Sequence, residues 1–372
     1  MTLDSRIQSG MSRMGFSKLT DIQNKVYEPA LENKNIIACS GTGTGKTLAF
    51  LIPTIVRNAD NNSLYAIIMA PSKELSMQIC SQINAISNAS GIVVRAVALF
   101  GGVNSRRQIE SLKKNKPHIV VGTCDRIYEL IKEKRLSVHT VNTFIIDEAD
   151  RLLNPDKYEL VGSLRKCCMR DIQIMAFSAS INDKTIEYAK QLTNGEFVNI
   201  LTKEKISIPS NIKNIYFIVP KKDKIEMVRK VIRAIGTKHC LIFTNSAYDA
   251  DEITQKLLYH KYNVAMLNSK VDKAKRKNII DAFRKEATDF LVCSDMAARG
   301  MDFKNVNAVI NIDISDNPTE YLHRAGRCGR DGLDAICASI ITDGQVNIIR
   351  KIQKTFNVNI IERHLYKGSI VK

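Results

Sequence analysis

The stretch Ile36–Leu48, I-I-A-C-S-G-T-G-T-G-K-T-L, determines which fold this chain is expected to adopt. Its apolar start predicts a buried strand, its glycine-rich middle a turn, and its end the start of a helix. Strand, glycine turn and helix in this order are typical of a phosphate-binding loop, because glycines let backbone N–H groups approach phosphate oxygens and the helix N-terminus favours an anion. The residues expected to bind a nucleotide here are Ser40, Gly41, Thr42, Gly43, Thr44, Gly45, Lys46 and Thr47.

Two side chains of this loop have expected roles of their own. Lys46 would reach the β- and γ-phosphates of the nucleotide, and the Thr47 hydroxyl would bind Mg²⁺. Ser40 stands where the usual pattern G-x-x-x-x-G-K-[ST] begins with glycine. A glycine-rich surface turn is the alternative, which the surrounding strand and helix disfavour.

Length and charge narrow the classes of protein. A chain of 372 residues has room for two domains, and its net charge of +17 favours a polyanionic partner, nucleic acid foremost. A general bias toward lysine would also explain the charge, and the clusters Lys113–Lys116 and Lys270–Lys277 could be solvated helix faces. No apolar run approaches the ~20 residues of a membrane span, and the N-terminus lacks a signal-peptide pattern. We therefore expect a soluble intracellular protein, with nucleus or cytoplasm left open.

The nine cysteines are scattered without a C-x-x-C pair, which favours free thiols over a zinc site or disulfides.

Apolar runs alternate with amphipathic stretches along the chain, which predicts parallel sheets with helices on both faces. A polar stretch near residues 202–212 divides the chain, so we expect a first domain at 1–203, a linker at 204–212 and a second domain at 213–372. The expected strands are Ile36–Cys39, Tyr65–Ala70, Val93–Phe100, His118–Gly122, Thr143–Asp147, Ile172–Ser178 and Phe197–Leu201, then Tyr216–Val219, Cys240–Thr244, Val264–Leu267, Phe290–Ser294, Ala308–Asp313 and Ala335–Thr342.

A second phosphate-related signal is the run Phe144–Asp150, F-I-I-D-E-A-D, in which a strand ends in carboxylates. Asp147 at the strand end suits Mg²⁺, and Glu148 suits polarisation of an attacking water. Without the phosphate loop, the same residues could simply begin a helix.

Together, Asp147-Glu148-Ala149-Asp150 and the loop Ser40–Thr47 resemble the DEAD-box family of ATP-dependent RNA helicases. The resemblance covers nearly the whole chain. It implies an α/β fold of two tandem RecA-like domains, with ATP and Mg²⁺ as cofactors and RNA as the partner. Upstream, G-F-S-K-L-T-D-I-Q is similar to the adenine-reading segment of the family, so Phe16 and Gln23 are expected at the base.

Further segments resemble the family's RNA-binding, nucleotide-binding and coupling motifs. In the first domain the resemblance assigns RNA contacts to Pro71, Ser72, Lys73, Gly101, Gly102, Thr123 and Arg126, and coupling to Ser178 and Ser180. In the second domain it assigns RNA contacts to Thr244, Asn245, Ser294 and Asp295, nucleotide contacts to Gly300 and Asp302, coupling to His323 and Arg324, and arginine fingers to Arg327 and Arg330. Cys124 and Asp125 replace proline and glycine of the family pattern, which adds an anion to an expected RNA surface.

The expected function is an ATP-dependent RNA helicase in which Lys46, Asp147, Glu148, Arg327 and Arg330 are catalytic. ATP and RNA together would favour a closed arrangement of the domains, and contacts to phosphates and 2′-hydroxyls would give little sequence preference. Two alternatives stay open: an ATP-gated RNA clamp with little unwinding, and an ATP-driven DNA translocase. A monomer is expected, recruited by its own surfaces or by protein cofactors, without membrane attachment.

Overall fold

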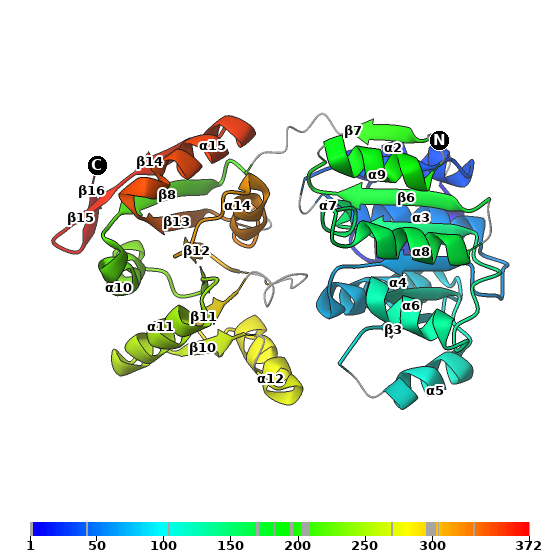
Figure 1. The fold of residues 1–372 in the computed structure, drawn as a ribbon, viewed down its shortest axis with the longest axis horizontal. Helices are drawn as coiled ribbons and strands as arrows, with labels where there is room; N and C mark the ends of the chain where they lie inside the picture. Colours follow the sequence, from blue (N-terminus) through cyan, green and yellow to red (C-terminus); the bar gives the residue numbers. More distant parts are fainter. Residues whose placement is uncertain are drawn as a thin grey trace. The chain divides into compact units, whose positions relative to one another are not determined.

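Parallel strands form the centre of each of two units, Met1–Ile206 and Ser207–Lys372, in the computed structural model (Figure 1). The structure describes residues 3–41, 44–102, 105–168, 171–181, 183–193, 196–201, 208–268, 271–294, 303, 305–329 and 332–371. Among these residues, no helix combines the length and the apolarity that a membrane span requires.

The first unit is built on a seven-stranded parallel sheet in the order β3-β4-β2-β5-β6-β1-β7. Its strands are β1 (Ile36–Cys39), β2 (Ala66–Met69), β3 (Ala96–Leu99), β4 (Ile119–Gly122), β5 (Thr143–Asp147), β6 (Gln173–Ser178) and β7 (Val198–Leu201). Its helices are α1 (Ser5–Arg13), α2 (Asp21–Leu31), α3 (Lys46–Arg57), α4 (Lys73–Ser90), α5 (Ser105–Asn115), α6 (Cys124–Lys132), α7 (Ala149–Leu152), α8 (Tyr158–Cys167) and α9 (Asp183–Leu192).

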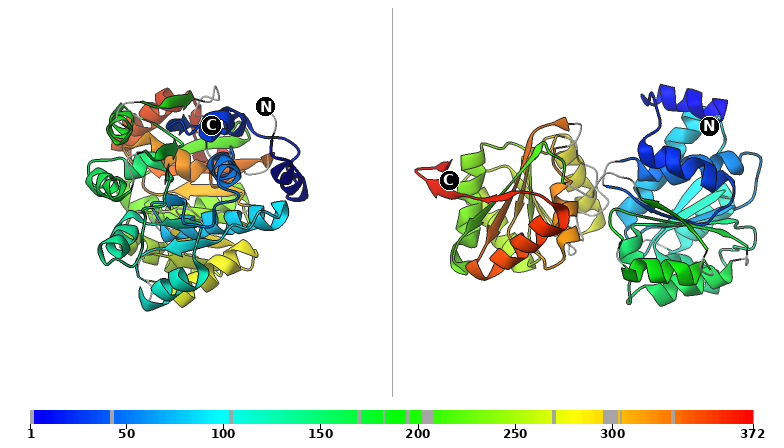
Figure 2. Two further views of the ribbon diagram at one scale, coloured as in Figure 1. Left: turned by 90° about the vertical axis from the view of Figure 1, so that its right-hand side faces the viewer. Right: turned by 90° about the horizontal axis from the view of Figure 1, so that it is seen from above.

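Helices cover both faces of this sheet, because successive side chains of a strand point to opposite faces and both faces are apolar. Ile36 and Ala38 belong to the core beneath α1 to α4, whereas Ile37 belongs to the core beneath α5 to α9. The right-hand view of Figure 2 shows these blue and green helices on opposite sides of the sheet. The predicted parallel sheet with helices on both faces is confirmed.

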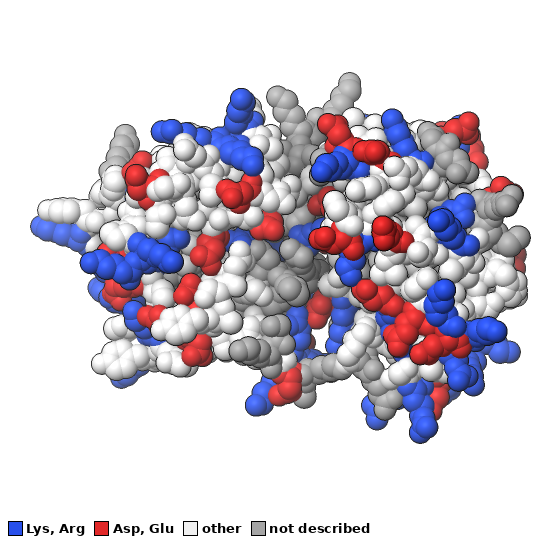
Figure 3. Space-filling model, viewed as in Figure 1, with Lys and Arg blue, Asp and Glu red and all other residues white. Residues whose placement is uncertain are grey.

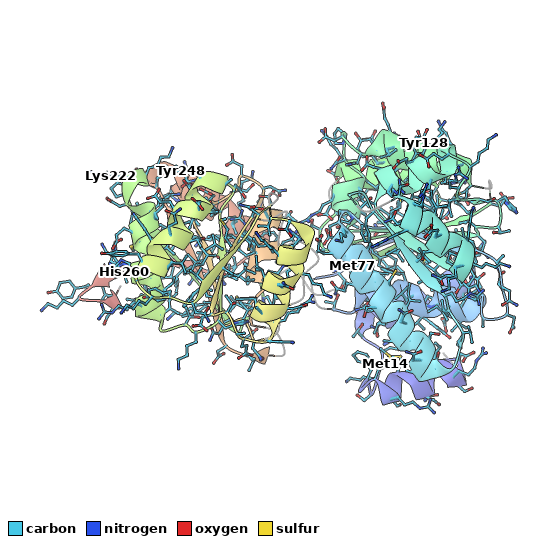
Figure 4. The ribbon with its side chains drawn as sticks, turned by 90° about the horizontal axis from the view of Figure 1, so that it is seen from below. Met14, Met77, Tyr128, Lys222, Tyr248 and His260 are labelled. Carbon is cyan, nitrogen blue, oxygen red and sulfur yellow. The ribbon has the colours of Figure 1, made fainter. Side chains whose placement is uncertain are left out.

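Helix α1 packs across the end of α4 that is remote from Met77, and Met14 marks this end in Figure 4. Gly10 permits the contact, since a Cβ atom there would lie 2.9 Å from the backbone nitrogen of Ser90. Helix α1 is therefore part of the core of the first unit, to which Ile7 and Met11 contribute.

The second unit repeats the design with the strand order β10-β11-β9-β12-β13-β8-β14, again parallel. Its strands are β8 (Ile212–Ile218), β9 (Cys240–Phe243), β10 (Val264–Leu267), β11 (Phe290–Cys293), β12 (Ala308–Asn311), β13 (Ala335–Ile341) and β14 (Ile360–Glu362), followed by an antiparallel hairpin of β15 (His364–Tyr366) and β16 (Ser369–Val371). Its described helices are η1 (Lys221–Asp223), α10 (Lys224–Ile235), α11 (Ala247–Tyr259), α12 (Lys273–Arg284), α14 (Pro318–Ala325), η3 (Asp343–Gln345) and α15 (Val346–Phe356).

Strand β8 begins at Ile212, four residues before the predicted strand and inside the stretch expected to be a linker. Its inward positions include a buried polar residue, Asn214, whose side chain accepts a hydrogen bond from the hydroxyl of Tyr321 at 2.8 Å. This polar residue interrupts the apolar pattern that the strand would otherwise show.

Candidate active site

The carboxyl ends of the first sheet carry the segments that the sequence singles out. Because all seven strands are parallel, these ends lie along one edge of the sheet, where ligands of such sheets bind. The strand order places the turn after β1 beside those after β6 and β5, and then come the turns after β2, β4 and β3. The expected nucleotide segments therefore occupy one half of this edge, and the expected RNA segments occupy the other half.

The phosphate loop leads directly into α3 and is held by Gln23. Gly45, the residue before α3, has φ of 90°, a conformation that favours glycine. The Gln23 amide donates to the Gly45 carbonyl at 3.1 Å and accepts from the backbone N–H of Thr20 at 2.9 Å. A Cβ atom at Gly45 would lie 2.4 Å from Nε2 of Gln23, so the two residues fit only without one. Phe16 is 42% exposed just before this segment.

Lys46 folds back onto the loop that precedes it. Its ammonium donates to the carbonyl oxygens of Ser40 at 2.7 Å and Gly41 at 2.5 Å. The Ser40 hydroxyl donates to Thr44 Oγ1 at 2.7 Å, so a serine in place of glycine adds a bond within the loop. Burial lowers the pKa of Lys46, against the opposing effect of Asp147. Thr47 follows Lys46 in the first turn of α3.

Asp147 and Glu148 form a carboxylate pair at the end of β5. Asp147 is buried, and its Oδ1 accepts from the backbone N–H of Glu148 at 2.9 Å. Burial, reinforced by the neighbouring Glu148 carboxylate, raises the pKa of Asp147 to about 7. Glu148 has φ of 51° and ψ of 53°, and its carboxylate lies 3.1 Å from the guanidinium of Arg151. Such hard carboxylate oxygens beside a phosphate loop suit Mg²⁺.

Asp150 links the turn after β5 to the turn after β6. Its Oδ1 accepts from the Ser178 hydroxyl at 2.5 Å and its Oδ2 from the Ser180 hydroxyl at 3.4 Å. The backbone N–H of Ser180 also donates to Ser178 Oγ at 3.2 Å. Burial raises the pKa of Asp150, although the Ser178 hydroxyl favours its ionised form. The structure thus brings both predicted coupling serines onto one carboxylate.

The turn after β2 begins α4. Ser72 caps this helix, since its Oγ accepts from the backbone N–H of Leu75 at 3.2 Å. The Lys73 ammonium lies 5.1 Å from the ring centroid of Phe100, the residue that follows β3. Pro71 is partly exposed at the same turn.

The turns after β3 and β4 complete this half of the edge. Gly101 and Gly102 are exposed, and Gly102 has φ of 72°. Thr123 precedes α6, and its backbone N–H donates to the carbonyl of Leu99 at 3.0 Å. Exposed backbone groups at a helix start are suited to contacts with phosphates.

Arg126 lies inside the protein instead of on this surface. Its guanidinium donates to Gln108 Oε1 at 2.9 Å and Ser105 Oγ at 2.7 Å, and it lies 2.7 Å from the Glu129 carboxylate. With 6% exposure, Arg126 joins α5 to α6.

The anion that Asp125 adds to α6 has a counter-ion. Asp125 Oδ2 lies 2.9 Å from Nζ of Lys157, which precedes α8. Cys124 takes the first helical position with its thiol buried against the sulfur of Met69 at 3.5 Å. Burial raises the pKa of Cys124 to about 12, so this thiol is an apolar packing group.

In the second unit, Arg324 contacts residues at the carboxyl ends of both β9 and β12. Its guanidinium donates to the Asp313 carbonyl and, at 3.3 Å, to Asn245 Oδ1, and it lies 5.3 Å from the Phe243 ring centroid. The Asp313 carboxylate accepts from the Thr244 hydroxyl at 2.8 Å and from the backbone N–H of Asn245 at 2.9 Å. Predicted RNA and coupling residues thus share one network.

The remaining predicted residues are partly exposed or lie outside the described part of the chain. His323, Arg327 and Ser294 are partly exposed, and each has an interaction partner. The predicted residues outside the described part of the chain are Thr42, Gly43, Asp295, Gly300, Asp302 and Arg330.

Known proteins match nearly the whole length of the chain. The family model described as "DEAD/DEAH box helicase" matches residues 20–188, and the model "Helicase conserved C-terminal domain" matches residues 223–332. The "Probable ATP-dependent RNA helicase YfmL" of Bacillus subtilis is 35% identical over 369 residues, which cover 99% of this chain and 96% of that protein. This chain belongs to the DEAD-box helicase family.

Other family members agree with this assignment. The DEAD-box ATP-dependent RNA helicase CshC of Bacillus cereus is 32% identical over 98% of this chain and 93% of its own length. The structure of S. cerevisiae Dbp5 bound to RNA and ADP BeF3 has a TM-score of 0.85 and 25% identity, covering 97% of this chain and 93% of its own. Mss116p bound to ssRNA and AMP-PNP has a TM-score of 0.85 and 27% identity, covering 98% and 78%. The two-domain RecA-like fold is therefore confirmed.

Three residues of this DEAD-box chain have contacts that the sequence analysis did not assign. Asp150 belongs to the motif Asp147-Glu148-Ala149-Asp150, and its position three residues after the end of β5 is the signal that could have revealed it. Asp313 ends the predicted strand Ala308–Asp313, and a carboxylate at a strand end is the signal that could have revealed it. Lys157 carries no comparable signal, since its partner Asp125 lies 32 positions away.

Proposed function

We propose that this chain is an RNA-dependent ATPase that couples ATP binding and hydrolysis to unwinding of short RNA duplexes or remodelling of RNA–protein complexes. One observation carries the proposal: in a DEAD-box family member, Asp150 joins the turn after β6, which lies next to the phosphate loop, to the turn after β5, which lies next to the first turn of the RNA half, through Ser178 and Ser180. Relatives named ATP-dependent RNA helicases, and the structure of Dbp5 with RNA and ADP BeF3, support the same activity.

The nucleotide half would bind ATP through the loop Ser40–Thr47, with Gln23 and Phe16 at the adenine. Lys46 would exchange its present contacts with the loop carbonyls for contacts with phosphate oxygens of ATP. Backbone N–H groups of the loop would contact the same phosphates. Asp147 and Thr47 would hold Mg²⁺, whose charge neutralises phosphate oxygens. The fit is supported by the buried Asp147 carboxylate, which has a single hydrogen bond recorded among the described residues.

Glu148 would orient and polarise the attacking water, since its carboxylate is exposed enough to reach solvent. Arg151, whose guanidinium lies 3.1 Å from this carboxylate, would hold it in position. Arg327 and Arg330 would supply positive charge to the terminal phosphate, and Gly300 and Asp302 would contact the nucleotide. These assignments follow from the motifs of the family.

The RNA half would bind a strand through backbone groups and hydroxyls at the turns after β2, β3 and β4. Such contacts favour phosphates and 2′-hydroxyls over bases, so little sequence preference and a strong dependence on salt are expected. Thr244, Asn245, Ser294 and Asp295 would add contacts from the second unit. A monomer recruited by protein cofactors would suffice for this activity.

The test substitutes Glu148→Gln, which keeps the size of the side chain and removes its basicity. ATP and RNA affinities are expected to stay within twofold, while RNA-stimulated ATP turnover falls by about 10²–10⁴-fold. Glu159→Gln, an exposed position on α8, is the matched control and should turn over ATP normally. Normal hydrolysis by Glu148→Gln would contradict the role given to Glu148.

Two assays beside this one separate the alternatives. RNA-stimulated ATPase without strand release from a short duplex would favour the ATP-gated clamp. Equal stimulation by matched DNA and RNA would favour the DNA translocase.

A further inference from the structure

A small pocket lies at the opposite edge of the first sheet from the motif turns. It has a volume of about 270 Å³ and is lined by polar residues that precede β2, β4 and β5, namely Asn62, Ser63, Lys113, Lys116, Arg135 and Ser137. We call it the amino-edge pocket. None of its residues belongs to the motifs assigned above, and Lys113 and Lys116 form a basic cluster that the proposed function leaves unexplained.

The amino-edge pocket is strongly cationic. Three of its lining side chains carry positive charge, and no carboxylate is among the described residues that line it. Among the described residues, no ion pair neutralises Lys113, Lys116 or Arg135, although Arg126 and Lys157 in the same unit both have carboxylate partners. Figure 3 shows basic side chains gathered at the lower right of the first unit, near the carboxyl ends of α5 and α6. A hollow with unpaired cations favours an anionic ligand.

The backbone around the pocket is fixed. Arg95 Nε donates to the carbonyls of Asn115 at 2.9 Å and Lys116 at 3.1 Å, which holds the turn after α5. Lys116 itself has φ of 41°, a conformation that a lysine adopts only when its surroundings impose it. Beneath the cations, Leu112 and Leu136 are buried. The pocket is therefore built on ordered segments.

Helix stabilisation explains only part of this charge. Lys113 lies in the last turn of α5, where a cation is favourable near the helix C-terminus. Lys116 and Arg135 lie outside helices, so this effect does not account for them. The convergence of cations from two separate turns on one hollow needs a different explanation.

We propose that the amino-edge pocket binds backbone phosphates of RNA that extends beyond the motif turns. The inference rests on the proposed RNA activity. A volume near 270 Å³ is below the ~300–1,000 Å³ of pockets for drug-sized ligands, so it suits a phosphate with part of its sugar. The Asn62 amide would complement the cations. Because four-residue strands separate the two edges by at least about 13 Å, a bound RNA would reach the pocket only by extending beyond the motif turns.

The test removes the three cations together in Lys113→Gln/Lys116→Gln/Arg135→Gln. The matched control, Lys166→Gln/Lys184→Gln/Lys190→Gln, removes three exposed charges from α8 and α9 of the same unit. Affinity is measured at several salt concentrations for single-stranded RNAs of about 10 and about 40 nucleotides, the shorter being near the ~4–16 nucleotides of common single-strand sites.

We expect the pocket variant to bind the long RNA about 4-fold more weakly at 0.15 M salt if one phosphate contact is lost, and about 50-fold if three are lost. The slope of log affinity against log salt should fall by about 0.7 to 2.1 in magnitude. Affinity for the short RNA and ATPase activity with it should be unchanged, as should both RNA affinities of the control.

An equal loss in the control variant, or an equal loss with the short RNA, would overturn the proposal. Unchanged affinity of the pocket variant for the long RNA would also overturn it. If that variant at the same time lost binding of polyglutamate, the pocket would be assigned to an acidic protein segment. The proposed function is tested separately, because failure of the short RNA to stimulate wild-type ATPase would refute that function and leave the pocket's affinity for long RNA measurable.

Discussion

Arg324 tests whether one buried side chain stabilises the carboxyl ends of β9 and β12 in the second unit. Its side chain is 2% exposed and donates to the Asp313 carbonyl and to Asn245 Oδ1. Bonds to a charged group contribute about 1.5–3 kcal/mol each, and removing the buried charge offsets part of that loss. We therefore expect Arg324→Met, which keeps much of the volume, to destabilise the ends of β9 and β12 by about 3 kcal/mol.

Hydrogen exchange measured by mass spectrometry on the full chain is the assay. A loss of 3 kcal/mol accelerates exchange through local opening by about 150-fold. The change should appear in peptides that cover β9 and β12, while strands of the first unit stay unchanged as an internal reference. Arg233→Met, at an exposed position of α10, is the control. Lost ATPase activity with unaltered exchange would show that Arg324 acts on a ligand and that the support described here is negligible.

Two further predictions concern the first unit. Gly45→Ala should weaken ATP binding at least 10-fold by calorimetry, because the added Cβ atom would meet Gln23 and a positive φ costs alanine about 1 kcal/mol. Gly91→Ala is the control, since Gly91 has the same kind of φ and no atom lies within 4 Å of its added Cβ atom. Equal ATP affinities in the two variants would contradict this reasoning. Asp4→Ala should cost about 1 kcal/mol of unfolding free energy above pH 4, because Asp4 caps α1. Hydrogen bonding from Arg6 lowers the pKa of Asp4 in the folded state, so this contribution is lost as the pH falls through that lowered value, and urea unfolding should show the gap to wild type closing.

Much of the fold was predictable because buried parallel strands are short apolar runs with few exceptions. Ile36–Cys39 and Thr143–Asp147 agree with the observed strands residue by residue. Strand β8 was predicted too short, since the polar Asn214 stands at an inward position, where its amide donates to the Ile212 carbonyl and accepts from the hydroxyl of Tyr321. The hairpin β15–β16 was missed because each strand has three residues, although Lys367-Gly368, both with positive φ, is a typical hairpin turn.

The site segments were predictable one by one, but their order along the sheet edge was not. That order depends on which strands pair, and pairing is decided by contacts between residues far apart in sequence. Burial of two arginines was also missed. Arg126 precedes Leu130 by four positions on α6, and Arg324 follows Tyr321 by three on α14, so helix spacing placed both on buried faces. The motifs assign an RNA contact to Arg126 and coupling to Arg324, and neither role predicts burial.

The backbone of Glu148 has an evolutionary consequence. With φ of 51° and ψ of 53°, Glu148 has a left-handed conformation. This conformation costs a residue with a Cβ atom about 1 kcal/mol relative to glycine. A population of variants selected only for heat resistance would be expected to drift toward glycine or asparagine at this position. Retention of glutamate would then report selection for turnover, at the expense of robustness.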